Sequence, residues 1–192
     1  MGNTNITDLL SSGTAFADLS RWRKIAVSGV DALTWLDDLL PGDIAELAPG
    51  QARHSVLQSA TGADLARFTV AVAAAQVLLV QDPAQGRSLS GLLAPRVGSA
   101  DVVLDDRTED LALFAFPGRA VAPNAPGAAF CAPSCLGAGV DVFALMEERS
   151  YLASLFGHAF TPAGEDDVRA WRATEGRRSP AADAGGADRP GI

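Results

Sequence analysis

The residue types best suited to nucleophilic, redox or metal chemistry are sparse in this chain. Its cysteines, Cys131 and Cys135, are separated by three residues, and its histidines, His54 and His158, lie far apart. Zinc needs four ligands in a tetrahedral array, and the sequence offers no clear second pair, so we expect no metal site. A redox pair usually has C-x-x-C spacing, so we expect two reduced thiols. Without a nucleophile motif such as G-x-S-x-G, His54 is expected to be a half-buried structural residue.

Charged and aromatic side chains offer a second kind of chemistry. Asp64 could polarise an amine or a ligand nitrogen, and Arg67 could bind a carboxylate. Each also has a plainer interpretation, Asp64 as a solvated turn residue and Arg67 as an outward strand residue paired with an acid. Trp22, in an early loop, is the tryptophan best placed to line a ring-binding pocket.

Composition excludes several classes of protein. The 192 residues include 15 Lys and Arg against 23 Asp and Glu, a net charge of −8, so general binding of nucleic acid or anionic membrane is not expected. No apolar run reaches the roughly 18 residues that span a bilayer. We see no signal peptide or myristoylation pattern and expect a cytoplasmic location. Neither of the common glycine-rich nucleotide motifs is present, so nucleotide binding has no support in the sequence.

The pattern of apolar residues predicts an α+β fold, with helices packed on mainly antiparallel sheets. Several of the predicted strands are linked as hairpins rather than through helices. We expect residues 1–15 to be an N-terminal extension, 117–139 to be irregular and 177–192 to be a disordered tail. Strands are predicted at 24–28, 54–58, 68–72, 76–81, 101–104, 111–116 and 140–144, and helices at 32–40, 82–97, 147–156 and 165–175.

Short motifs follow one another in a definite order. Asp-Leu-Ser stands at 18–20, Val-Ser-Gly-Val-Asp-Ala at 27–32, Asp-Ile at 43–44 and Pro-Gly-Gln at 49–51. Gly139 and Asp141 then form a G-x-[DE] segment, and Arg172 begins a stretch similar to R-x-x-x-G-x-P. This order resembles the glycine-cleavage T-protein and YgfZ-type folate-binding superfamily over roughly residues 16–180, without the C-terminal barrel domain of that family.

The resemblance implies two small, intertwined subdomains over residues 16–176 and a site for a reduced folate such as tetrahydrofolate. Such a site needs a carboxylate for the amino-pyrimidine edge of the pterin, apolar walls and a cation for the glutamate tail. By the family pattern Asp141 takes the place of that carboxylate. Arg67, Arg172 and Trp22 are the other expected cofactor-binding residues, and Asp64 is the nearest candidate for a catalytic acid.

One departure from the family bears directly on activity. The acidic pair of the aminomethyltransferases falls here at Ala66 and Arg67. Asp64 lies two residues earlier, a displacement of about 6.6 Å along a strand. The sequence therefore favours a reduced-folate-binding protein of one-carbon metabolism, or of its regulation, over a full aminomethyltransferase. If the chain is catalytic, the family implies transfer of a one-carbon unit from an amine to tetrahydrofolate.

Two other classes of function remain open at this point. One is a non-catalytic, gamma-type subunit of a sarcosine-oxidase-like complex, in which a protein partner or a second copy covers an exposed apolar face. The other is a repurposed enzyme of the same fold that acts on an apolar small molecule.

Overall fold

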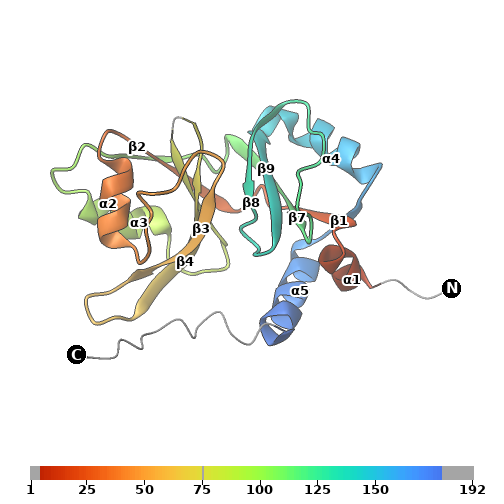
Figure 1. Cartoon of the computed structure of the whole chain (residues 1–192), viewed down its shortest axis with the longest axis horizontal. Coiled ribbons are helices and arrows are strands. Elements are labelled where there is room, and N and C mark those ends of the chain that lie inside the picture. The colour runs from red at the N-terminus through yellow and green to blue at the C-terminus, as the bar shows by residue number, and fades with distance from the viewer. Residues whose placement is uncertain (1–4, 75, 179–192) are drawn as a thin grey trace, which may run out of the picture.

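Two five-stranded sheets form the framework of the fold (Figure 1). A computed structural model of the chain describes residues 5–74 and 76–178, with side chains through residue 174. The first sheet, called the β7 sheet, contains β10 (Thr161–Ala163), β1 (Ala15–Asp18), β7 (Leu111–Pro117), β9 (Gly139–Leu145) and β8 (Ala128–Pro133) in that order. The second, called the β4 sheet, contains β3 (Ala52–Gln58), β4 (Asp64–Val72), β5 (Val77–Gln81), β2 (Arg23–Ser28) and β6 (Val103–Asp106).

All strand pairs are antiparallel except β1 with β10. The predicted α+β class with mainly antiparallel sheets is therefore confirmed. β7 lies at the centre of its sheet, and all seven of its residues are buried. Burial on both faces explains why its sequence is a continuous apolar run rather than an alternating one.

Three apolar clusters hold the elements together. One joins the β4 sheet to α2 (Ala32–Leu39) and α3 (Leu89–Leu93). A second covers the outer face of the β7 sheet, where Phe16, Phe114 and Phe116 surround Phe156 of α4 (Arg149–Gly157) with ring centroids 4.9–5.8 Å apart. The third lies between the two sheets and includes Ala71 and Val80 from one sheet and Leu113 and Ala115 from the other. The two sheets therefore share a core, which fixes their relative position.

The chain crosses from the β7 sheet to the β4 sheet through a tight turn at residues 19–22, called here the crossover turn. Its backbone closes with a bond from the Trp22 N–H to the Leu19 carbonyl, 2.8 Å. Asp18 Oδ1 accepts from both the N–H and the hydroxyl of Ser20, and the Ser20 hydroxyl oxygen accepts from the Leu113 N–H. The Asp-Leu-Ser motif thus begins the crossover turn and holds it to β7 through the hydrogen bond between Leu113 and Ser20.

The helices differ from the sequence prediction in instructive ways. The helix predicted for 82–97 begins only at Leu89 and ends as a 3-10 turn, η1 (Ala94–Arg96), because side-chain hydrogen bonds of Asp82 and Gln85 hold the preceding segment as a loop. The first two residues of the helix predicted for 147–156 belong instead to a short 3-10 turn, η2 (Met146–Glu148), and the α-helix begins at Arg149. No helix of the described residues is long and apolar enough to cross a membrane.

Four segments carry structure that the sequence did not predict, and one of them is β1, where no strand was expected. α1 (Ile6–Ser11) lies in the expected extension and buries Leu10 completely. β8 lies in the segment that we expected to be irregular, and β10 pairs with β1. α5 (Glu165–Arg178) runs two residues into the expected tail, and residues 179–192 lie outside the described part of the chain.

Gly29 and Asp31 of the Val-Ser-Gly-Val-Asp-Ala motif fasten the start of α2 to the segment before β6. Gly29 has φ +111°, and a Cβ atom there would lie 2.0 Å from the Asp101 carbonyl oxygen. Asp31 is the N-cap residue of α2, but its side chain accepts from the Asp101 N–H at 2.8 Å instead of capping the helix. Both contacts depend on a close approach of two backbone segments.

We expect Gly29→Ala to lower the free energy of unfolding by about 3 kcal/mol or more, because backbone strain and a clash add. The matched control is Gly62→Ala, at φ +80° with no heavy atom within 4 Å of the new Cβ. Strain alone should cost the control about 1 kcal/mol. Urea unfolding of both variants measures the difference, and equal losses would show that the contact with Asp101 is unimportant.

Candidate functional site

A half-open cavity of about 370 Å³ lies on the face of the β4 sheet that is turned toward the β7 sheet. Its floor is a row of side chains from neighbouring strands, because His54 pairs with Thr69 and Thr69 pairs with Val80. Side chains one pair further along, Val56 and Arg67, extend the floor toward solvent. The alternation of a strand places these residues on one face and sends their neighbours into the core under α2.

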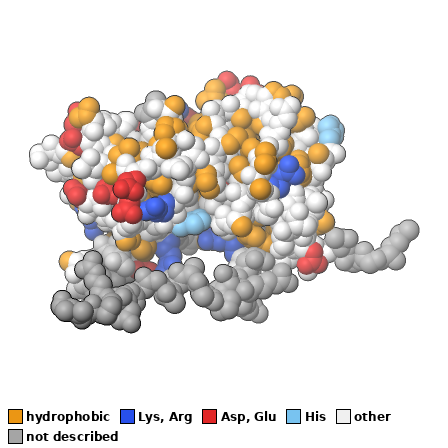
Figure 2. All heavy atoms as spheres, viewed as in Figure 1, with side chains coloured by type: hydrophobic (Ala, Val, Ile, Leu, Met, Phe, Trp, Pro, Cys, Tyr) orange, Lys and Arg blue, Asp and Glu red, His pale blue; other side chains and the backbone are white. Residues whose placement is uncertain are grey.

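The rim of the cavity comes from elements outside the floor. It consists mainly of Trp22 from the crossover turn, Asp82 and Gln85 from the loop after β5, Cys135 from the turn between β8 and β9, and Arg172 from α5. In the view of Figure 2, Lys and Arg side chains gather below the boundary between the part that carries the β4 sheet and the part that carries the β7 sheet. Asp and Glu side chains gather on the part that carries the β4 sheet. An acidic protein thus presents cations at this site.

Arg172 makes two contacts that fix its guanidinium at the rim. The guanidinium carbon lies over the Trp22 ring, 5.7 Å from the ring centroid, and Nη1 donates to Asp82 Oδ2 at 3.2 Å. Asp82 Oδ1 in turn accepts from the Ala84 N–H at 2.9 Å. An arginine stacked on an aromatic ring and bound to a carboxylate is already ordered for an anion.

Trp22, Asp82 and Arg172 also line a second cavity, of about 270 Å³, on the other side of the same wall. Leu19 and Val168 supply apolar surface there. The three shared residues therefore form a partition between the two cavities. Trp22 is only 6% exposed, so its ring is a fixed part of that partition.

Gln85 takes the place of a neighbouring strand beside Arg67. Its Oε1 accepts from the Arg67 N–H at 2.8 Å, and its Nε2 donates to the Arg67 carbonyl at 2.7 Å. The backbone of Arg67 is thereby held beyond the end of β5, and the guanidinium is left exposed at the cavity. Arg67 Nη2 donates to Asp64 Oδ2 at 2.6 Å.

His54 lies at the open side of the cavity, where its Nδ1 is 2.9 Å from the Thr69 hydroxyl oxygen. The residue is exposed at the surface, while its hydrogen bond to Thr69 is partly buried, so the expectation of a half-buried histidine is met in part. Partial loss of hydration lowers the pKa of His54, and the positive charge of Arg172 lowers it further. His54 is therefore a neutral hydrogen-bonding group at pH 7.

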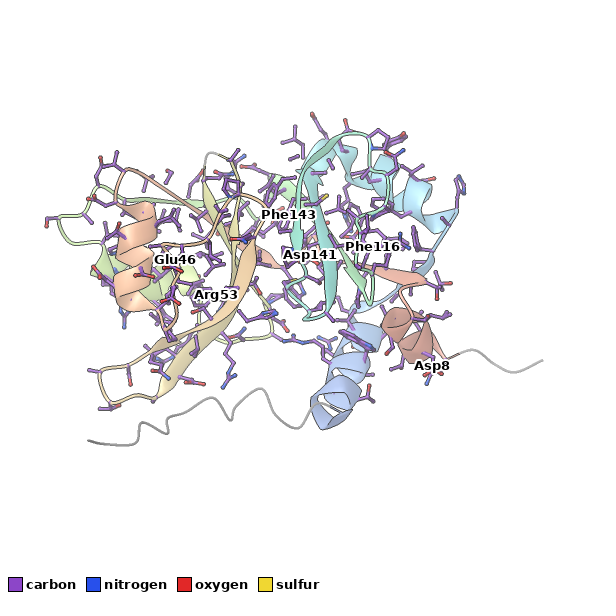
Figure 3. The ribbon with its side chains drawn as sticks, in the orientation of Figure 1. Asp8, Glu46, Arg53, Phe116, Asp141 and Phe143 are labelled. Carbon is purple, nitrogen blue, oxygen red and sulfur yellow. The ribbon has the colours of Figure 1, made fainter. Side chains whose placement is uncertain are left out.

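Asp141 lies one layer behind the cavity, in β9 (Figure 3), and is 1% exposed. Its Oδ1 accepts from the Ser134 hydroxyl at 2.6 Å and its Oδ2 from the Cys135 N–H at 2.8 Å. The carboxylate thus holds the turn that presents Cys135 to the cavity. Burial raises the pKa of Asp141 to about 6, against the opposing effect of these hydrogen bonds.

The two cysteines are free and belong to different parts of the interior. Cys135 is packed between the sheets, while Cys131 packs in the cluster that contains Phe156. Burial raises the pKa of the Cys135 thiol well above its ordinary value, and the nearby Asp141 carboxylate raises it further. A thiol in this state is a poor nucleophile. Among the described residues, no three potential metal ligands come together.

The structure brings three of the five sequence-predicted site residues to one cavity, namely Trp22, Arg67 and Arg172. A β-bulge in the β3–β4 pair places Asp64 opposite Gln58, at the outer end of the face that carries Arg67. Sequence reasoning missed Asp82 and Gln85, because the Asp82-Pro83 pair was interpreted as the start of a helix. The period-two alternation of β3 and β4 could have placed His54 and Thr69 on the same face as Arg67.

These features define a two-sheet α+β protein with a cation-rimmed ligand cavity, and comparisons with known proteins identify its family. The family described as "GCVT N-terminal domain" matches residues 8–123, more than half of the chain. The chain belongs to this family, so the predicted T-protein resemblance is confirmed. A search of curated proteins finds no match.

Two solved structures are similar to the chain. The glycine cleavage system aminomethyltransferase T from Bartonella henselae aligns with TM-score 0.70 and 19% identity, over 87% of this chain and 53% of that one. The present chain therefore spans about half the length of that protein and shares its fold. A heterotetrameric sarcosine oxidase from Corynebacterium sp. U-96, in complex with pyrrole 2-carboxylate, aligns with TM-score 0.44 and 10% identity, over 87% of this chain and 93% of that one.

The buried Asp141 carboxyl predicts a definite pH dependence of stability. Its pKa is raised from 3.8 to about 6 in the folded state, so protonation favours folding. This contribution, at most about 3 kcal/mol, is fully present below about pH 4 and is lost as the pH rises to about 6.

We expect Asp141→Asn to remove that part of the slope when free energies of unfolding are measured from pH 3.5 to 7. Ser134→Ala is the control, because it keeps the titrating carboxyl and removes one hydrogen bond that lowers the pKa of Asp141. The slope should persist in this control. An unchanged slope in Asp141→Asn would show that this carboxyl does not titrate as described.

Proposed function

We propose that the chain binds a reduced folate in the cavity between its two sheets and serves one-carbon metabolism or its regulation. The observation that carries the proposal is the convergence of a buried tryptophan, two arginines and a carboxylate on one cavity of about 370 Å³. Cavities from about 300 Å³ upward hold small organic ligands when a few polar groups set the orientation. Membership of the family and the likeness to an aminomethyltransferase support this class of ligand.

The residues present fit the two ends of a folate. The ring of Trp22 and the side chain of Val80 would cover the pterin, and Arg67 would meet the glutamate carboxylates. Arg172 would lie beside the pterin, because its guanidinium contacts both Trp22 and Asp82. A carboxylate can accept about four hydrogen bonds. Asp82 uses two, from Arg172 and the Ala84 N–H, and therefore retains acceptor capacity for an amino-pyrimidine edge. When bound, a reduced folate would supply nitrogen atoms that can carry a one-carbon unit.

Asp141 has a different part in this proposal from the one that the sequence suggested. The Asp141 side chain is only 1% exposed and is not part of the cavity lining, and its oxygens accept hydrogen bonds from the turn at Ser134 and Cys135. The carboxylate that faces the cavity is that of Asp82. We therefore propose that Asp82 contacts the pterin and that Asp141 acts by keeping the turn in place.

The geometry of β4 favours binding over aminomethyl transfer. At the positions of the acidic pair of the aminomethyltransferases, Ala66 is buried in the core under α2, and Arg67 points to the cavity. A cation thus occupies the cavity-facing position. Asp64 is held by Arg67 in an exposed ion pair at the outer end of the strand, which leaves it poorly placed as a catalytic acid.

Calorimetric titration with 5-formyltetrahydrofolate and tetrahydrofolate tests the proposal. We expect micromolar binding by the unaltered chain and at least a tenfold rise in Kd for Asp82→Asn and for Arg172→Gln, each about 1.4 kcal/mol. Each variant removes a charge-assisted contact with the ligand. Arg107→Gln is the control, because its guanidinium pairs with Asp105 and Asp110 on the surface and lies outside the cavity.

The comparison with Asp141→Asn separates the two carboxylates. If Asp82 contacts the pterin, Asp82→Asn should weaken binding more than Asp141→Asn does. The reverse order would assign the pterin contact to Asp141, as the sequence suggested. Absence of heat with a folded protein would refute the folate proposal altogether.

A further inference from the structure

Lys24, in β2, is a charged side chain that the fold buries completely, at 0% exposure. Its Nζ donates to the backbone carbonyl of Ser20 at 2.8 Å and to that of Trp22 at 2.6 Å. A buried ammonium loses its hydration and is retained only where hydrogen bonds replace the lost water. Both of these acceptors belong to the crossover turn, so both hydrogen bonds that the ammonium makes stabilise that turn.

The backbone of Lys24 joins the second crossing between the sheets as well. Its N–H donates to the Thr108 hydroxyl at 3.1 Å, and its carbonyl accepts from the Arg107 N–H at 2.8 Å. Arg107 and Thr108 lie between β6 and β7, where the chain returns from the β4 sheet to the β7 sheet. Lys24 is therefore hydrogen-bonded to both segments that connect the two sheets.

The crossover turn carries Trp22, which is part of the partition between the two cavities. The carbonyl carbon and the side chain of Trp22 are both bonded to its Cα atom. A rotation of the turn that moved the carbonyl would therefore also move the ring away from Arg172. The hydrogen bonds of Lys24 to the Ser20 and Trp22 carbonyls oppose this rotation. The interaction is buried from solvent, and it restrains the turn that carries Trp22.

We propose that Lys24 is a positioning residue, whose buried ammonium fixes the crossover turn so that Trp22 forms the wall between the two cavities. The proposal deepens the proposed function and rests on it only for the ligand measurement below. Loss of the positive charge would weaken both bonds to the turn, since hydrogen bonds from a charged donor are the stronger kind.

The groups around Lys24 make this charge sensitive to alkaline pH. Burial lowers the pKa of Lys24 to about 8. The negative charges of Glu109, Asp106 and Asp18 oppose that effect, as does Cys135 in the neighbouring turn. The ammonium should therefore be lost as the pH rises through about 8, within the range where the protein can be studied in its folded state.

The first test needs no ligand. In the full chain labelled with 5-fluorotryptophan, the fluorine resonance of Trp22, assigned with Trp22→Phe, should shift with a midpoint near pH 8. The resonance of Trp35, whose indole N–H donates to the Arg96 carbonyl in the other core, should stay in place. In Lys24→Met the Trp22 resonance should be displaced and independent of pH. Arg107→Gln, which alters a cation of the second crossing, should retain the pH response.

The second test is calorimetric titration of Lys24→Met with 5-formyltetrahydrofolate, for which we expect at least a tenfold rise in Kd. Binding should weaken because a displaced Trp22 ring would lose its contact with the pterin. A Trp22 resonance that ignores pH in the unaltered chain, or that moves together with Trp35, would overturn the proposal, and this outcome is decisive even if Lys24→Met does not fold. A normal pH response without any folate binding would leave the positioning role in place and refute the proposed function.

Discussion

The structure depends on the contact between its two sheets. The outer face of the β4 sheet is covered by α2 and α3 and that of the β7 sheet by α4, while the inner faces meet in a shared core that α1 and α5 join. That core contains small side chains such as Ala71 and Ala115. Small residues let the two sheets approach closely at that point. Toward Trp22 and Thr69 the contact gives way to the cavity, so the site is the place where the shared core opens. The hydrogen bonds of Lys24 to both crossings maintain that arrangement from within.

This arrangement explains why a site with positive charge exists on an acidic protein. The β4 sheet supplies the floor of the cavity, and α5 supplies Arg172. The Arg172 guanidinium donates to Asp82, in the loop after β5. The ion pair is partly exposed, and pairs of this kind add little to stability. The ion pair instead holds the Arg172 guanidinium over the Trp22 ring, in a position to bind an anionic ligand. Stability comes instead from the three apolar clusters.

Much of the fold could be predicted from local patterns, and the failures have physical causes. The strand at 111–116 and the helix ended by Pro41-Gly42 are confirmed, because long apolar runs and a clear stop signal are strong local information. β8 escaped prediction because it is an edge strand, where Pro133 is tolerated. α1 and β10 are short, and their contacts with distant strands stabilise them. Local patterns could not predict the cavity either, because Asp82 and Arg172 meet there although 90 positions separate them in the sequence.

The central claim is that a reduced folate lies against Trp22, between the sheets. The most direct measurement is the fluorine spectrum of the 5-fluorotryptophan-labelled chain during titration with 5-formyltetrahydrofolate at pH 7. The account predicts a saturable shift of the Trp22 resonance, while Trp35, which is packed in the core under α2, stays unchanged. A shift at Trp35 alone, or saturable binding that leaves Trp22 unmoved, would contradict it.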